Sequence, residues 1–332
     1  MTRLRATSLP RLERASEVIT PDRRRIVIAF AAAILIFVIG AVLHHGFASH
    51  GSIEAILTVA SFVGLVAAGQ SFVILVGGID LSVPWVLTGA AVLFATSSLG
   101  HNDRAVPAIL IALGLGLGIG LINGIGVAYL AVPAVVMTVA MNGVMQGLTL
   151  GVSKGLTCSS CASSAPPNVQ SAFDSRHLGI PSSLLLWLAV TLIVGFVLSM
   201  TTFGRMIYAT GQNPRAAYLS GVRVKAVTVA LYMLSGLFAA LAGIALVAYG
   251  GQPSLGMGDP YLFQSIAAAV IGGLSILGGR GHYFGTVAGA ITLVALISLL
   301  QAEHMPEYGR SIIYGVTILV ILLLFGRKEH VA

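Results

Sequence analysis

The chain has 332 residues, of which 57% are hydrophobic and only 9% are charged. Soluble domains carry about 25% charged residues, so this composition excludes an ordinary soluble protein and predicts a surface that faces lipid. The apolar runs do not alternate in segments of about 10 residues, as the strands of a membrane β-barrel do. We therefore expect an all-α, polytopic transmembrane helical bundle.

The formal net charge is +7, and the positions of the basic residues decide what this charge means. They cluster before the first apolar run, in the segment 202–225, and at Arg327 and Lys328. Excess Lys and Arg flank membrane helices on the cytoplasmic side. We interpret the charge as a topology signal rather than as phosphate binding, so we expect cytoplasmic termini, contact with membrane lipid and no nucleic acid.

Ten segments are apolar enough to be membrane spans, which need about 20 mostly apolar residues. They are residues 26–45, 54–77, 84–99, 106–128, 132–151, 183–201, 227–249, 264–278, 283–302 and 311–326. Two of them, 84–99 and 264–278, are also compatible with re-entrant segments, which are tolerated where they line a cavity. The polar stretch before residue 26 is too long for a typical signal peptide, so we expect the first span to be retained.

These spans define the predicted domain organisation. We expect residues 1–25 to form a basic cytoplasmic segment, 26–326 a transmembrane domain, and 327–332 a cytoplasmic tail. Counting spans from a cytoplasmic N-terminus places the segment 202–225 inside and the segment 152–182 outside. The basic residues of 202–225 agree with that count.

The first feature of note in chain order is a carboxylate at the end of an apolar run. The residues Gly78, Asp80, Leu81 and Ser82 belong to the sequence Gly-Ile-Asp-Leu-Ser-Val. A charged side chain at the centre of a membrane helix costs about 2.5 kcal/mol or more. We expect Asp80 to have a structural role, capping or bonding a broken segment around Gly77 and Gly78.

Several polar side chains lie within the predicted spans. A solute pathway needs sparse donors and acceptors, but Asn and Gln in membrane helices also bond neighbouring helices, and both interpretations stay open. The polar residues in question are Ser71, Asp80 and Ser82, and the candidates for a translocation pathway are Gln70, Asn123, Asn142, Gln146 and Gln264.

Cys158 and Cys161 are the only cysteines. Their spacing is compatible with a redox dithiol, half of a zinc site or a small disulfide, and we favour an incidental pair or a disulfide that stiffens the loop. We expect no metal site. A phosphate-binding Gly-x-x-x-x-Gly-Lys-Ser/Thr motif does not occur, so the chain itself is not a P-loop ATPase.

The segment 202–225 contains a short helix with clear end signals. Asn213 is a good N-cap, Pro214 suits the first helical position, and Gly221 suits the left-handed residue that ends a helix. So short a helix is marginal alone in water and needs a docking partner. Its body consists of Arg215, Ala216, Ala217, Tyr218, Leu219 and Ser220. We expect Ala216 and Ala217 to form a small face and the side chains of Tyr218 and Leu219 to project into a partner's groove.

Four stretches, in this order and spacing, carry a resemblance to a known family. They are Val76-Gly-Gly-Ile-Asp-Leu-Ser-Val83; Leu121-Ile-Asn-Gly-Ile-Gly-Val-Ala-Tyr-Leu130, followed by Val132-Pro133-Ala134 and Thr138; residues 203–213 with 216–221; and residues 265–273, followed by 278–281 and 285–286. They resemble permease subunits of the sugar-type ATP-binding-cassette importers, the group that contains the ribose, galactose and autoinducer-2 permeases. The chain departs from the family pattern at Pro84-Trp85 and at His282-Tyr283-Phe284.

The resemblance implies a location in the bacterial cytoplasmic (inner) membrane and a set of partners. These are a second permease subunit, identical or related, a cytoplasmic ATP-binding-cassette ATPase that binds ATP and Mg, and an extracytoplasmic solute-binding protein. It also makes 202–225 the cytoplasmic coupling loop on which the ATPase acts. The chain itself then needs no cofactor.

The expected function is the non-catalytic membrane subunit of an importer for a small polar solute, most plausibly a monosaccharide. Alternating access would be driven by the separate ATPase subunit. The alternative is an ion-gradient-driven secondary transporter, for which intramembrane carboxylates would serve as ion sites. An intramembrane enzyme finds no catalytic constellation in the sequence.

Overall fold

The structure is a computed structural model, and it describes residues 20–155, 164–177, 179–306, 308–310, 312–313 and 315–316. Cys158, Cys161, the tail 327–332 and most of the predicted span 311–326 lie outside the described residues. The same holds for most of the basic segment 1–25, so the proposed domain ends stay predictions.

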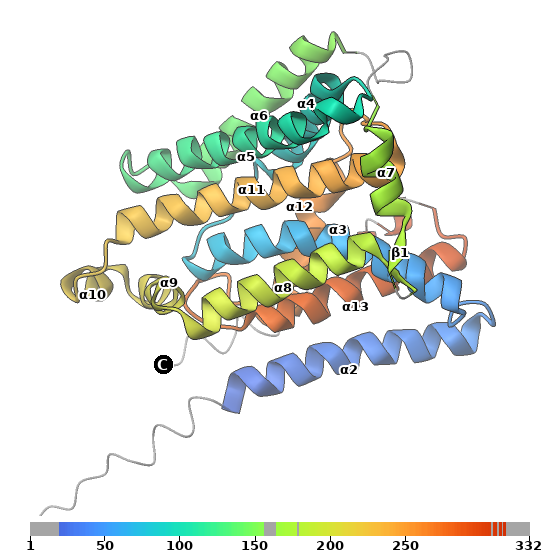
Figure 1. The fold of residues 1–332 in the computed structure, drawn as a ribbon. Coiled ribbons are helices and arrows are strands. Elements are labelled where there is room, and N and C mark those ends of the chain that lie inside the picture. Colours follow the sequence, from blue (N-terminus) through green and yellow to red (C-terminus); the bar gives the residue numbers. More distant parts are fainter. Residues whose placement is uncertain are drawn as a thin grey trace, which may run out of the picture.

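The described residues form an almost entirely helical bundle (Figure 1). The elements are α2 (Thr20–Leu43), α3 (His50–Leu75), α4 (Val83–Ser98), η1 (Asn102–Arg104), α5 (Ala105–Ala128), α6 (Ala134–Ser153), α7 (Pro167–Asp174), β1 (Arg176–His177), β2 (Ile180–Pro181), α8 (Ser182–Met200), α9 (Thr202–Gln212), α10 (Pro214–Leu219), α11 (Val224–Gly250), α12 (Asp259–Ile271) and α13 (Tyr283–Ala302). The two strands pair antiparallel, with Arg176 opposite Pro181.

Seven helices of the described chain are long and apolar enough to cross a membrane. They are α2, α3, α5 (counted with η1), α6, α8, α11 and α13. The two predicted spans that were compatible with re-entrant segments are the shorter helices α4, with 16 residues, and α12, with 13. The prediction of a polytopic helical membrane protein is confirmed, whereas the count of ten spans stays a prediction.

The predicted span 264–278 is not one continuous helix. Helix α12 stops at Ile271, and the residues 272–282 form a loop before α13. Gly273, Gly278, Gly279 and Gly281 in this loop all have positive φ angles, which L side chains rarely adopt. The glycine-rich sequence therefore breaks the apolar run into a helix and a turn-rich loop.

The core of the bundle is built around α3 and α11. Every residue of α3 from Ala60 to Leu75 is buried, as expected for a helix that is apolar on all sides and surrounded by others. Helix α11 packs against α3, α4 and α5. Helix α2 lies at the periphery beside α13 (Figure 1) and exposes a stripe of large apolar side chains, which suits a surface in contact with lipid.

The glycines of α5 permit close contact with α11 only on one face. A Cβ at Gly116, Gly120 or Gly124 would overlap the backbone of α11, whereas one at Gly114 or Gly118 would meet nothing within 4 Å. Residues four apart lie on one face of a helix. Close helix packing therefore explains the first three glycines and not the other two.

The two ends of the bundle carry different structures. The first turn of α2 lies at the same end as α9 and α10, and α7 with the β1–β2 hairpin lies at the opposite end (Figure 1). We refer to these as the α10 end and the hairpin end. The predicted coupling loop and the start of the first predicted span therefore lie at the same end of the bundle.

Candidate functional site

The chain between α3 and α4 is a broken segment, residues 76–82, that lies inside the bundle. Helix α3 ends because Gly77 turns into the left-handed region, with φ 78°, and α4 resumes at Val83. Asp80 and Ser82 are each only 1% exposed. A buried carboxylate needs hydrogen-bond donors to offset its desolvation.

Asp80 obtains these donors from its own segment and from α11. Its Oδ1 accepts from the Ser82 N–H at 3.0 Å and the Ser82 hydroxyl at 2.6 Å, and its Oδ2 accepts from the Ser235 hydroxyl at 2.7 Å. The carboxylate thus ties the broken segment both to itself and to a neighbouring helix. These contacts suit the structural role expected from the sequence.

Two of the candidate pathway residues belong to the same network. The side-chain amide of Gln70 pairs with the Asp80 backbone, its nitrogen donating to the carbonyl and its oxygen accepting from the N–H, each at 3.2 Å in the orientation that satisfies both groups. Asn123 Nδ2 donates to the Ser82 hydroxyl at 2.9 Å. Thr138 of α6 donates to the Ile79 carbonyl at 3.3 Å.

The other candidate pathway residues lie outside this network. Asn142 is half-buried and Gln146 is exposed, both on α6, and Gln264 is half-buried on α12. Ser71 instead links helices, because it donates to Thr286 of α13 at 3.2 Å. The structure therefore separates the enclosed network around Asp80 from Ser71, which is buried elsewhere, and from three amides that are half-buried or exposed.

The short helix α10 has the ends that the sequence predicts. Asn213 Oδ1 accepts from the Ala216 N–H at 3.0 Å, Pro214 begins the helix, and Gly221 has φ 87°. Ala217 is buried against the rest of the chain, whereas Ala216 is exposed, so the two alanines do not form one docking face.

The projecting side chains of α10 are those that were expected to project. Tyr218 is 70% exposed and Leu219 is 78% exposed. Arg215 and Ser220 are exposed beside them. Helix α10 therefore presents an apolar pair with polar neighbours at one end of the bundle, the composition of a small docking surface.

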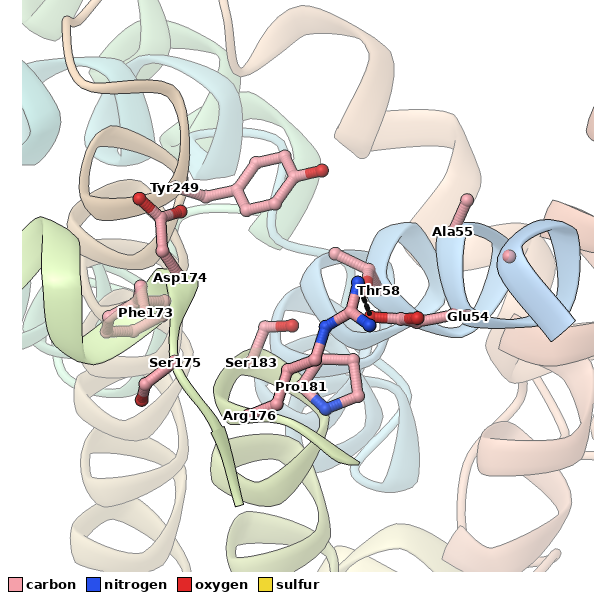
Figure 2. A pocket seen from close by; sticks show the side chains of 11 residues that line it. Glu54, Ala55, Thr58, Phe173, Asp174, Ser175, Arg176, Pro181, Ser183 and Tyr249 are labelled. Carbon is pink, nitrogen blue, oxygen red and sulfur yellow. Dashed lines mark ion pairs between the residues drawn. The ribbon is translucent and has the colours of Figure 1, made fainter. Parts of the chain in front are cut away.

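The hairpin end holds an open cavity of about 300 Å³ that sequence reasoning missed (Figure 2). Arg176 of β1 reaches across to Glu54 of α3, with 2.9 Å between Nη2 and Oε1, and Figure 2 shows Asp174 and Tyr249 on the opposite side. The cavity joins elements distant in sequence, so spacing alone gives no signal for it. Within the described ranges, no three His, Cys, Asp or Glu side chains lie together as metal ligands would.

The fold and the site define a class: a multi-pass membrane protein with broken inner segments and a short, largely exposed helix at one end. The residues 52–322 match the protein family described as branched-chain amino acid transport system / permease component, and the chain belongs to that family. The resemblance inferred from the sequence is confirmed.

Named relatives agree with this assignment over most of both chains. The ribose import permease protein RbsC of Escherichia coli (strain K12) is 34% identical over 302 residues, 90% of this chain and 92% of the relative. The autoinducer 2 import system permease protein LsrC of Escherichia coli (strain K12 / DH10B) is 32% identical over 309 residues, 92% of this chain and 88% of the relative. The LsrC protein of Shigella flexneri is 33% identical over the same shares. The chain is therefore a multi-pass permease of the bacterial inner membrane.

Proposed function

We propose that this permease is the membrane subunit of an ATP-driven importer and that it carries a monosaccharide-type solute. The observation that carries the proposal is the similarity, over at least 90% of this chain, to import permeases for ribose and autoinducer 2. The chain would work beside a second permease subunit, with a cytoplasmic ATPase that binds ATP and Mg and an extracytoplasmic solute-binding protein. No catalytic step belongs to the chain itself.

The chemistry of the spans supports a neutral solute over an amino acid. A branched-chain amino acid carries an ammonium and a carboxylate, each of which needs a counter-charge or several dipoles at membrane depth. Asp80 is the one acidic residue between Glu54, near the start of α3, and the end of α4, and both its oxygens are engaged. Neutral hydroxyl groups need only amides and hydroxyls as partners.

The geometry favours some candidate pathway residues over others. Gln70 and Asn123 are completely buried and bonded to the broken segment, so they are poor candidates for contact with a solute. Gln146 and Asn142 lie on α6, where Gly143 and Gly147 leave open space beside the helix. An exposed amide is unfavourable against lipid. We therefore place the pathway along this face of α6, with Gln264 as a further candidate.

The docking surface for the ATPase is α10 in this proposal. Its exposed Tyr218 and Leu219 side chains suit insertion into a groove, and its position at the same end as the start of α2 (Figure 1) agrees with a cytoplasmic location. The termini would then be cytoplasmic and the cavity at the hairpin end would face the binding protein. The number of spans is ten if the short helices α4 and α12 and the segment 311–326 cross the membrane in addition to the seven long helices.

The test is uptake by proteoliposomes that contain this chain with its ATPase subunit, supplied with the binding protein. The first probe is radiolabelled ribose. We expect uptake only when ATP is inside the vesicles and the ATPase subunit can hydrolyse it. Leucine should not be accumulated. Accumulation of either solute by the chain alone under an ion gradient would support the secondary transporter instead and would overturn the proposal.

A further inference from the structure

The loop 272–282 contacts two elements that are distant from it in the sequence. The Gly279 N–H donates to the Leu75 carbonyl at 2.8 Å, and the Gly279 carbonyl accepts from Gln212 Nε2 at 3.2 Å. Leu75 is the last residue of α3, and such terminal carbonyls accept no hydrogen bond within their own helix. One loop residue therefore bonds the end of α3 and the end of α9.

The backbones of these three elements touch directly. A Cβ added to Gly211 of α9 would overlap the Leu75 carbonyl and lie 2.5 Å from the Gly279 nitrogen. A Cβ added to Gly278 would lie 2.7 Å from the Gly77 nitrogen. We call this contact of Leu75, Gly77, Gly211, Gly278 and Gly279 the three-backbone junction. Because no side chain lies between the backbones, a displacement of one is passed to the others rather than absorbed.

A second bond holds α9 to the same loop. The Tyr208 hydroxyl donates to the Gly281 carbonyl at 3.0 Å. Tyr208 and Gln212 are four residues apart, so both side chains leave the same face of α9. Ile207, beside them, is completely buried. Helix α9 is therefore fixed to the loop at two points one turn apart.

The other end of this connection is α10. Asn213 alone separates α9 from α10, and its side chain caps α10. The junction in turn adjoins the broken segment 76–82, since Leu75 and Gly77 lie at its start. A continuous path of backbone contacts thus runs from the docking helix to both broken segments.

We propose that Tyr208, Gly211 and Gln212 are positioning residues that transmit a movement of α10 to the segments 76–82 and 272–282 together. The inference rests on the proposed function, in which the ATPase acts on α10. Movement of α9 shifts the loop through Gly279 and Gly281 and shifts the end of α3 through Leu75. The two segments then change position as one unit rather than in succession.

The test measures whether the loop responds to nucleotide and whether solute movement stays tied to ATP hydrolysis. Leu277 is a loop residue that is 70% exposed, so Leu277→Cys, in a chain with Cys158→Ser and Cys161→Ser, reports the loop through its rate of maleimide labelling. In the full complex we expect a non-hydrolysable ATP analogue to change this rate by about threefold or more. Gly211→Ala should abolish the change and lower ribose uptake per ATP hydrolysed by about tenfold.

Milder variants guard against a folding defect in Gly211→Ala. Tyr208→Phe and Gln212→Ala each remove one hydrogen bond, and each should lower the uptake per ATP hydrolysed by about fivefold. The matched controls are Gly114→Ala, where a Cβ meets nothing within 4 Å, and Tyr308→Phe, whose side chain is 74% exposed. Both controls should keep the wild-type ratio.

The outcomes separate the inference from the proposed function. If the unmodified complex shows no ATP-dependent uptake of ribose or another monosaccharide, the proposed function is wrong. If the complex does show ATP-dependent uptake, but the labelling rate of Leu277→Cys is the same with and without nucleotide, the inference alone is overturned. The inference is likewise overturned if all three junction variants keep the wild-type ratio, or if uptake and hydrolysis fall in proportion.

Discussion

The two broken segments interrupt the bundle in the same way but are held in place by different groups. The segment 76–82 is held by buried side chains, with Asp80 at the centre and Gln70 and Ser235 around it. The loop 272–282 is held through its own backbone, with Gly279 bonded to the ends of α3 and α9. The segment 76–82 should therefore be destabilised when a polar side-chain group is removed, and the loop 272–282 when a side-chain atom is added.

The largest effect is expected from removing the carboxylate of Asp80. Asp80→Ala leaves the Ser82 and Ser235 hydroxyls without their buried acceptor and should cost about 3 kcal/mol or more. We expect a collapse in the yield of monodisperse protein, measured by size-exclusion chromatography in detergent. Asp103→Ala, at an exposed position, is the control. The conservative Asp80→Asn should impair uptake or assembly, and wild-type values of both would contradict the role given to the network.

The next largest effect is expected from adding a methyl group to the glycine loop. Gly279 and Gly155 both have φ 69°, so Ala at either position carries the same left-handed strain of about 1 kcal/mol. A Cβ at Gly279 would also lie 2.5 Å from the backbone nitrogen of Gln212, whereas a Cβ at Gly155 would meet nothing within 4 Å. Gly279→Ala should therefore cost about 1–3 kcal/mol more than Gly155→Ala. Equal melting temperatures of the two variants would refute the close packing.

A smaller, qualitative contrast separates the enclosed amides from the exposed ones. Gln70→Leu leaves the Asp80 backbone unpaired and should lower stability by about 1–3 kcal/mol. Gln146→Leu should leave the melting temperature of the purified chain unchanged, because the side chain is exposed, yet reduce uptake if α6 lines the pathway. If Gln146→Leu were destabilised and Gln70→Leu were not, the assignment of Gln70 as the enclosed amide and Gln146 as the exposed one would be wrong.

The smallest effect is expected at the ion pair of the hairpin end. Arg176 is largely exposed, with 60% of its side chain accessible, so its pair with Glu54 should contribute about 0.2–1 kcal/mol. Arg176→Ala should shift the melting temperature little, and the shift should vanish at high salt. A loss of stability comparable to that of Asp80→Ala would show that solvent exposure does not determine how much these carboxylates contribute to stability.

Much of this arrangement was predictable because particular residues obey local rules. Asn213, Pro214 and Gly221 mark the ends of α10 by cap chemistry that depends only on near neighbours. Asp80 was identifiable because a lone carboxylate in an apolar run is costly and must be bonded. Each of the first nine predicted spans contains one helix, since long apolar runs leave few alternatives.

The remainder depended on contacts between distant segments. A glutamine in an apolar helix does not indicate its face, so Gln70, which bonds Asp80, was grouped with Gln146, which is exposed. Gly211 gave no local signal, because its need for a missing Cβ comes from Leu75 and Gly279. The end of α12 at Ile271 was missed because apolar residues continue through the glycines that follow.

Helix α10 packs against the rest of the bundle through very little of its surface. Only Ala217 of this helix is buried, and its cap bonds stay within residues 213–222. The outward side chains are thus free to be exchanged without repacking the core. In the proposed assembly, the exposed side chains of α10 would determine which ATPase binds. Replacing Arg215, Tyr218 and Leu219 with the residues of another permease should therefore make this chain bind that permease's ATPase, while the transported solute stays the same.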